Sequence, residues 1–503
     1  MILLDSASLL LCAWVLTGAL RVIADPLERL ALAGIGFGLL KSLEIFCLLV
    51  LGRIPLLLEQ TVMSVAALAA ALVWALVRSR RPAPPPEPPR VKAPVRLKLA
   101  AGAGVLALTA AALGLNAWFP VTAPDGLEYQ VRAWDFFHRG DLLAPHTTPV
   151  FRQYPPLVPL LFAWLYSAGC STEKLIFPVV SLLLTLVLYA RVRATTRNET
   201  LAVWAALVWA TTPYVFWHSL LGLLNLTTAA GFALGVFYGH ELFRRLSREN
   251  PPGPLWPWAL LSGIGFGAAA WTRPEMVLYT VLPLFLLMYQ LHRVPRLDGD
   301  SDGRLLGAFA LPALGAPLLW GAVLILKIPG LLPASGLVLA LTLAEAALAG
   351  LWAAGWFRAS GKSLAMWIGG GALVFLILLF AGEGALGPWR ALSLGAFRTV
   401  VFHVFFAFTF LVLAFVFTTR WSRLDAAGRS LGLFLAGYLV LHFAVYTLLP
   451  QKAPDAVQFF DSFFISPGDA VNSPDTREYL AWYPAFLLWV TQLSKVRRAF
   501  DEA

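Results

Sequence analysis

The sequence predicts an all-α protein that crosses a membrane many times. Of its 503 residues, 59% are apolar and only 13% are charged, and the mean hydropathy is +0.73. Soluble domains have roughly 45–50% apolar and about 25% charged residues. The apolar residues occur in repeated runs near 20 residues, which is the length an α-helix needs to cross a bilayer, and not as the short alternating strands of a membrane barrel. We therefore expect a polytopic helical membrane protein.

About fifteen such runs can be distinguished, and each is a candidate transmembrane helix. The first three fall within residues 1–77, which we expect to form an accessory N-terminal unit. Residues 78–98 follow as a basic, Pro-rich linker that should be extended. Residues 99–503 would then form a membrane domain of about twelve helices.

Lysine and arginine gather in every second segment between the spans, for example at 78–98, 244–248 and 495–498. The positive-inside rule makes these segments cytoplasmic. Two long loops, 119–174 and 450–479, would then face the outside. The net charge of +10 is explained by this cytoplasmic collar, which favours anionic membrane lipids as neighbours. We expect no nucleic-acid partner.

Lys41 and Glu44 lie one helical turn apart inside the second expected span. A charged side chain within a bilayer is costly unless it is paired. The spacing predicts that these two side chains neutralise each other, and it gives no reason to assign them a function.

The first outer loop contains the most informative segment, Pro124–Pro156, which is polar and charged in an otherwise apolar chain. Asp125 and Glu128 have the spacing of a helix capping box, and Gly140 suits a helix end, so a helix is expected between them. A second helical piece should run from Tyr154-Pro155-Pro156 to about residue 169. The first helix would be amphipathic and lie in the membrane interface. Its apolar face would carry Leu127, Val131, Trp134 and Phe137, and its charged face Glu128, Arg132, Asp135 and Arg139.

Each of several charged residues on the expected outer face could have a structural role or a functional one. Asp125 can cap the helix, and an ionised carboxylate can also orient and activate a hydroxyl. Arg273 and Glu275 can neutralise each other, or Arg273 can face a phosphate. Arg477 can anchor the last span at the interface, or its guanidinium fork can bind a phosphate there.

Five short motifs follow one another along residues 99–503, and all of them fall on the expected outer face. They are Asp125 with Tyr129, Gly140–Pro145, Tyr154-Pro155-Pro156-Leu157, Thr272–Glu275, and Arg477-Glu478-Tyr479 with Pro484. In their order and placement they resemble the GT-C superfamily of polyprenyl-phosphate-sugar-dependent glycosyltransferases. The most similar members are the protein O-mannosyltransferases and the lipid A aminoarabinose transferases.

The resemblance implies a GT-C-like bundle that transfers a sugar to an acceptor hydroxyl of a lipid, glycan or protein. The donor would be a sugar on a polyprenyl phosphate, and transfer would take place on the outer side of a membrane, for which we expect the bacterial inner membrane. Asp125 matches the base of inverting members. A divalent metal is possible as a cofactor, although the sequence shows no clear ligand cluster. The substrate-binding candidates are Glu128, Tyr129, Arg152, Tyr154, Arg273, Glu275, Arg477 and Tyr479.

The sequence also departs from these relatives. They often carry Asp-Glu in tandem, whereas Gly126 follows Asp125 here, and Glu128 takes a position that is often Arg. Tyr154 stands where the aminoarabinose transferases tend to have Lys, which argues against that activity itself. A transporter or flippase of lipid-linked sugars is one alternative, but it predicts mid-span charges and repeated halves. A glycan polymerase or ligase shares the donor and the location, and stays open.

Overall fold

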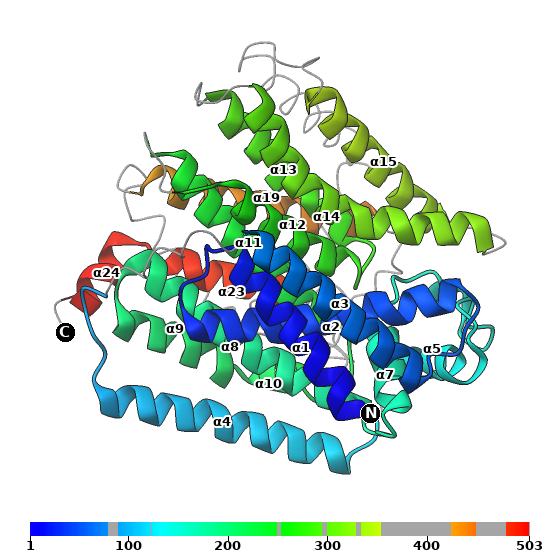
Figure 1. Cartoon of the computed structure of the whole chain (residues 1–503). Coiled ribbons are helices and arrows are strands. Elements are labelled where there is room, and N and C mark those ends of the chain that lie inside the picture. Colours follow the sequence, from blue (N-terminus) through cyan, green and yellow to red (C-terminus); the bar gives the residue numbers. More distant parts are fainter. Residues whose placement is uncertain are drawn as a thin grey trace, which may run out of the picture.

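The structure is a computed structural model that describes residues 1–78, 89–121, 123–248, 253–293, 299–327, 333–353, 424–448 and 479–501. Helices make up most of these residues, as expected (Figure 1). Six helical segments are long and apolar enough to cross a membrane, and shorter apolar helices accompany them. The prediction of an all-α integral membrane protein is confirmed.

The helices follow one another with short connections in most of the described parts of the chain. In chain order they are α1 (Ile2–Ala19), α2 (Pro26–Val50), α3 (Leu57–Arg78), α4 (Val95–Trp118), α5 (Pro124–Arg139), α6 (Pro149–Arg152), α7 (Leu157–Ser167), the 3-10 turn η1 (Glu173–Leu175), α8 (Ile176–Thr196), α9 (Glu199–Thr211), α10 (Pro213–His218), α11 (Asn225–Leu246), α12 (Trp256–Ala270), α13 (Met276–Arg293), α14 (Gly299–Lys327), α15 (Pro333–Ala353), α19 (Ala426–Leu448), α23 (Tyr479–Val490) and α24 (Ser494–Asp501).

The N-terminal helices are packed into the rest of the bundle. Helix α1 packs on α2 and α3, and α2 also packs against α7 and α8. Glu28 of α2 accepts a hydrogen bond from the Tyr238 hydroxyl at 2.7 Å and lies 3.4 Å from the Arg191 guanidinium. Whether residues 1–77 act as a separate accessory unit stays a prediction, but α2 shares its buried polar contacts with α8 and α11.

A buried ion cluster joins the three N-terminal helices. Lys41 Nζ lies 2.7 Å from Glu44 Oε2, which confirms the predicted pair, and 2.7 Å from Asp5 Oδ1. The hydroxyl of Ser64 completes the cluster, 2.7 Å from the same Asp5 oxygen. The Asp5 contact was not predicted, because it joins residues 36 apart in sequence. These contacts fix α1 and α3 against α2.

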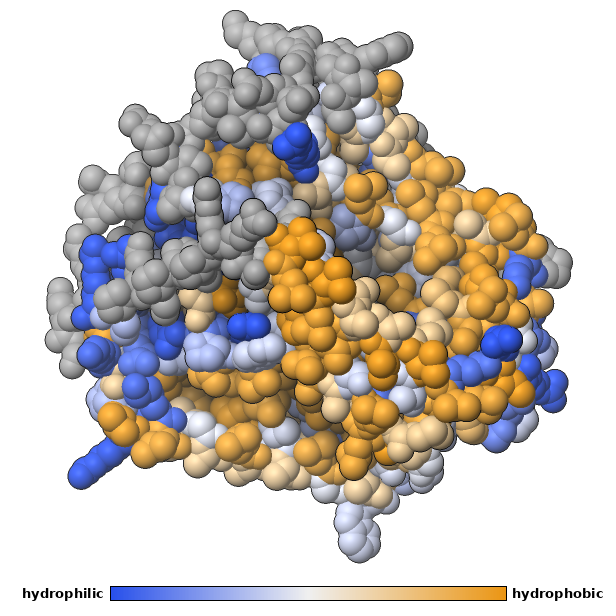
Figure 2. Space-filling model, in the orientation of Figure 1, coloured by the Kyte–Doolittle hydropathy of each residue, from blue (hydrophilic) through white to orange (hydrophobic). Residues whose placement is uncertain are grey.

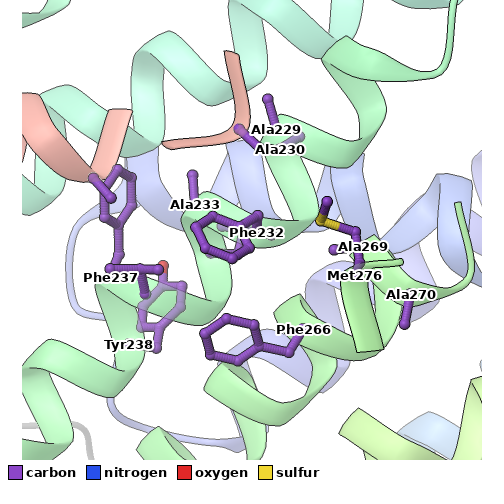
Figure 3. Packing of buried hydrophobic residues seen from close by; sticks show 14 of the residues in the cluster. Ala229, Ala230, Phe232, Ala233, Phe237, Tyr238, Phe266, Ala269, Ala270 and Met276 are labelled. Carbon is purple, nitrogen blue, oxygen red and sulfur yellow. The ribbon is translucent and has the colours of Figure 1, made fainter. Parts of the chain in front are cut away.

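Close helix contact at the centre of the bundle depends on glycine. Helices α11 and α12 approach so closely at Gly235 and Gly265 that a Cβ on Gly265 would lie 2.1 Å from the Gly235 nitrogen. On the same two helices the Phe232 and Phe266 rings meet edge to face at 5.5 Å (Figure 3). Helix α12 packs on α14 in turn. This rigid pair positions the segment after α12, which belongs to the site.

The outer surface has the distribution of polarity that a membrane protein needs. Helix α4 runs along one edge of the bundle, and only Ala112 and Asn116 on it are buried (Figure 1). Figure 2 shows hydrophobic side chains over the middle of one face, with hydrophilic side chains gathered toward its left and right edges. The helices thus present apolar surface where lipid tails would lie.

Candidate functional site

Helix α5 forms the frame of the segment 119–174, and it begins two residues earlier than a capping box with Asp125 as N-cap would require. Its N-cap is Ala123, Pro124 occupies the first helical position and Asp125 lies in the first turn. The capping prediction for Asp125 is wrong, because the fixed φ of a proline favours a helix start at that position. Glu128 Oε2 instead accepts a hydrogen bond from the Thr148 amide at 3.1 Å. Gly140, at φ +63°, ends the helix as predicted.

The expected charged face of α5 is divided in the structure, because its two middle residues point into the protein whereas Arg139 is exposed. Arg132 and Asp135 are fully buried, whereas Leu127, Val131 and Trp134 are 45%, 38% and 45% exposed. A helix on a water-soluble protein shows the opposite arrangement. The apolar stripe of α5 therefore suits the membrane interface, and a polar region lies beneath the helix.

Arg132 is the centre of this polar region, and the sequence did not single it out as a site residue. Its Nη1 donates hydrogen bonds to the carbonyl oxygens of Phe151 and Tyr154, at 3.0 and 2.7 Å. Its guanidinium also lies over the ring of Trp320, 5.1 Å from the centroid. One signal was present: Arg132 follows Asp125 by seven residues, so the two lie on the same side of the helix.

Four of the expected substrate-binding residues come together around α5 and α6. The Tyr129 ring meets Phe151 edge to face at 5.4 Å, and Phe151 stacks on Tyr154 at 5.7 Å. Arg152 donates from Nη2 to the carbonyl oxygens of Pro145 and Thr147, both at 3.0 Å. Glu128, Tyr129, Arg152 and Tyr154 thus form one neighbourhood.

A second group of expected residues joins this neighbourhood through the backbone. The Leu157 amide donates to the Trp271 carbonyl at 3.2 Å, and Trp320 Nε1 donates to the Gln153 carbonyl at 2.9 Å. Just beyond Trp271, Arg273 and Glu275 form an ion pair with each other. This confirms that the two side chains neutralise each other and leaves little net charge on Arg273 for a ligand.

The last two expected site residues lie near the end of the chain. Tyr479 begins α23, but its side chain and all of Arg477 lie outside the described residues. Across the described ranges, no group of three His, Cys, Asp or Glu side chains could hold a metal ion. The described residues therefore offer no site for a divalent metal.

Two apolar cavities lie beside α2. The larger one, of about 530 Å³, is lined by α1, α2, α11, α12 and α14, and Trp271 forms part of its wall. The smaller one, of about 270 Å³, lies between α2, α7, α8 and α11. Ile35, Leu39 and Ala268 line both, so the two spaces are neighbours. A chain of apolar carbon atoms could fill either of them.

Comparison with known proteins gives only distant likenesses. No protein-family model matches the chain, and no curated protein matches it. Two solved structures of an oligosaccharyltransferase from Archaeoglobus fulgidus are similar at 14% identity. The complex with zinc and sulfate matches with TM-score 0.34 over 75% of this chain, and the apo form with TM-score 0.35 over 77%. The chain spans about half the length of that protein, 53% and 50%. Likenesses of this size carry no argument about function.

The structure gives a packing reason for the glycine at position 126, directly after Asp125. A Cβ at this position would lie 2.6 Å from Val121 Cγ1 and 3.4 Å from the Gly222 carbonyl oxygen. We expect Gly126→Ala to lower the free energy of unfolding by about 1–3 kcal/mol, as overpacking does. Thermal melting of the purified protein measures the effect. Gly102→Ala in α4 is the control, because nothing lies within 4 Å of its Cβ. Equal melting temperatures for the two variants would contradict the prediction.

Proposed function

We propose that the chain is a membrane glycosyltransferase that moves a sugar from a polyprenyl-phosphate donor to an acceptor hydroxyl on the extracytoplasmic face. One observation carries this proposal. Arg132 of α5 donates to the Tyr154 carbonyl, the nearby Leu157 amide donates to the Trp271 carbonyl, and Trp271 also lines an apolar cavity of about 530 Å³. A donor with a lipid tail and a charged head needs both environments side by side.

The residues suggest how transfer would proceed. Asp125 accepts the proton of the acceptor hydroxyl, and the acceptor oxygen then bonds to the anomeric carbon. The bond between that carbon and the phosphate oxygen breaks on the opposite side, so the configuration inverts. Polyprenyl phosphate leaves with one additional negative charge. A fixed cation beside the leaving oxygen stabilises this charge, and Arg152 suits that task better than Arg273, whose charge Glu275 offsets.

The other candidate residues would shape the site. Tyr129 and Tyr154 stack with Phe151 and offer ring faces to a sugar. Glu128 holds the Thr148 amide and so fixes the loop that carries Arg152. Arg477 keeps its proposed role at the donor phosphate, and Tyr479 stays a candidate for substrate binding. The acceptor would be a lipid, a glycan or a protein of the cell envelope.

The proposal is tested with the full-length protein in lipid nanodiscs. A synthetic short-chain polyprenyl-phosphate sugar is added together with a crude envelope extract as the source of acceptor. We expect release of polyprenyl phosphate that depends on the extract, and mass spectrometry of lipid that co-purifies with the protein should reveal a polyprenyl phosphate. Movement of the sugar lipid across the bilayer with no release of polyprenyl phosphate would instead identify a flippase.

A further inference from the structure

The charged residues buried on α5 differ in how well they are neutralised. The Asp135 carboxylate lies 2.7 Å from His146 Nδ1, accepts from the His146 amide at 3.1 Å and lies 3.7 Å from Arg139. Arg132 has no such neighbour: within the part of the chain that the structure describes, no carboxylate lies at ion-pair distance from it. A buried charge without a partner is strongly unfavourable. An arrangement of this kind is typical of a site that binds an ion of opposite charge.

The unused donors of Arg132 point to the same conclusion. Only Nη1 makes hydrogen bonds, whereas Nε and Nη2 are buried and have no partner among the described residues. The side chain is 0% exposed, so water cannot satisfy these nitrogens from bulk solvent. Burial lowers the pKa of Arg132 to about 9, and the charge of Arg152 adds to that effect. The guanidinium thus keeps one edge free in a place where charge is disfavoured.

Arg152 adds a second cation to this surrounding. It interacts electrostatically with Arg132, and its Nη2 donates to two backbone carbonyls, those of Pro145 and Thr147. Its Nε is also buried and unbonded within the described ranges, and no carboxylate there forms an ion pair with it. Repulsion between two neighbouring cations raises the free energy of the folded protein. A bound anion that contacts both cations would offset this repulsion.

We propose that Arg132 and Arg152 form a binding site for a phosphate group, with the free Nε–Nη2 edge of Arg132 as its central contact. A guanidinium edge matches two phosphate oxygens, so this geometry favours phosphate over a halide. The inference rests on the proposed function for its preferred source, the phosphate of a lipid-linked donor, although inorganic phosphate has the same head-group chemistry. Arg132 is not accessible to solvent in this structure. Arg152 is partly exposed, so the anion would enter from the side on which Arg152 lies.

The test measures binding without any sugar transfer. The full chain in nanodiscs is titrated with farnesyl phosphate, inorganic phosphate or farnesol, and protection is followed by thermal melting. We expect farnesyl phosphate to raise the melting temperature of the wild type and farnesol to leave it unchanged. Arg132→Lys keeps a cation that can reach the two carbonyls but loses the guanidinium edge, and should weaken affinity by about tenfold to a hundredfold. Arg139→Lys, on the exposed side of α5, is the control and should bind as the wild type does.

Each outcome decides the matter. Protection by farnesyl phosphate alone that needs Arg132 supports the site with a lipid source, and equal protection by inorganic phosphate supports it with a soluble one. Unchanged affinity in Arg132→Lys overturns the proposal. If that variant does not fold, Arg152→Gln replaces it, and wild-type affinity there overturns the proposal equally. Binding that depends on Arg132 in a protein that transfers no sugar would leave this site standing while the proposed function fails.

Discussion

Replacing Asp125 with Asn is expected to reduce sugar transfer by about 10²–10⁴-fold, the usual contribution of a general base. The amide has nearly the same shape as the carboxylate but cannot accept the acceptor's proton. Asp125 lies in the first turn of α5, on the same side of the helix as Arg132. Release of polyprenyl phosphate by the protein in nanodiscs gives the turnover, and donor affinity should change little.

Asp141→Asn is the matched control for this experiment. It lies in the same loop, and its Oδ1 accepts a hydrogen bond from the Leu143 amide at 2.8 Å, a contact that the Asn oxygen can also make. We expect wild-type turnover in this variant. A similar loss in both variants would show that removing any negative charge from the loop matters. Wild-type turnover in Asp125→Asn would show that another group is the base.

Removing the charge of Lys41 should have the largest effect on stability. Its ammonium lies 2.7 Å from both Asp5 and Glu44, and the Lys41 and Asp5 side chains are both 0% exposed. Lys41→Met leaves two buried carboxyl groups without a cation, which costs about 3–5 kcal/mol. Thermal melting in detergent at neutral pH measures the loss.

Two further variants separate the charge effect from the loss of a long side chain. Arg53→Met breaks an ion pair with Glu59 at 2.8 Å that is largely exposed, so it should cost about 0–1 kcal/mol. The triple variant Asp5→Asn, Lys41→Met, Glu44→Gln removes all three charges and should recover most of the lost stability. If Lys41→Met melts like Arg53→Met, the cluster does not hold the N-terminal helices together.

The features that sequence predicted well are those that arise between near neighbours. The apolar runs predicted the helices, Gly140 predicted the end of α5, and the pairs Lys41–Glu44 and Arg273–Glu275 follow from short spacings. The capping box failed for a local reason as well, because Pro124 competes with Asp125 for the helix start. When a proline directly precedes an Asp-x-x-Glu pattern, the proline and not the Asp should be expected to mark the start of the helix.

Features that depend on tertiary contacts were missed. Nothing in the sequence joins Asp5 to Lys41 or the Leu157 amide to the Trp271 carbonyl. The sequence also could not predict which face of α5 is buried. A helical pattern distinguishes two faces, but it does not show which of them packs against the rest of the protein. Arg132 was therefore placed on a charged surface, whereas it is among the most deeply buried cations in the described residues.

The outward apolar stripe of α5 has a consequence for how this protein is handled. Leu127, Val131 and Trp134 are each more than a third exposed, so the surrounding amphiphile completes their cover and helps to hold the helix in place. Since Tyr129 and Arg132 are on the same helix, any lift or tilt of α5 would reach them directly. Acyl-chain length and headgroup charge should thus tune ligand affinity, and harsh short-chain detergents should weaken it before the fold is lost. In effect the bilayer is a structural component of the pocket.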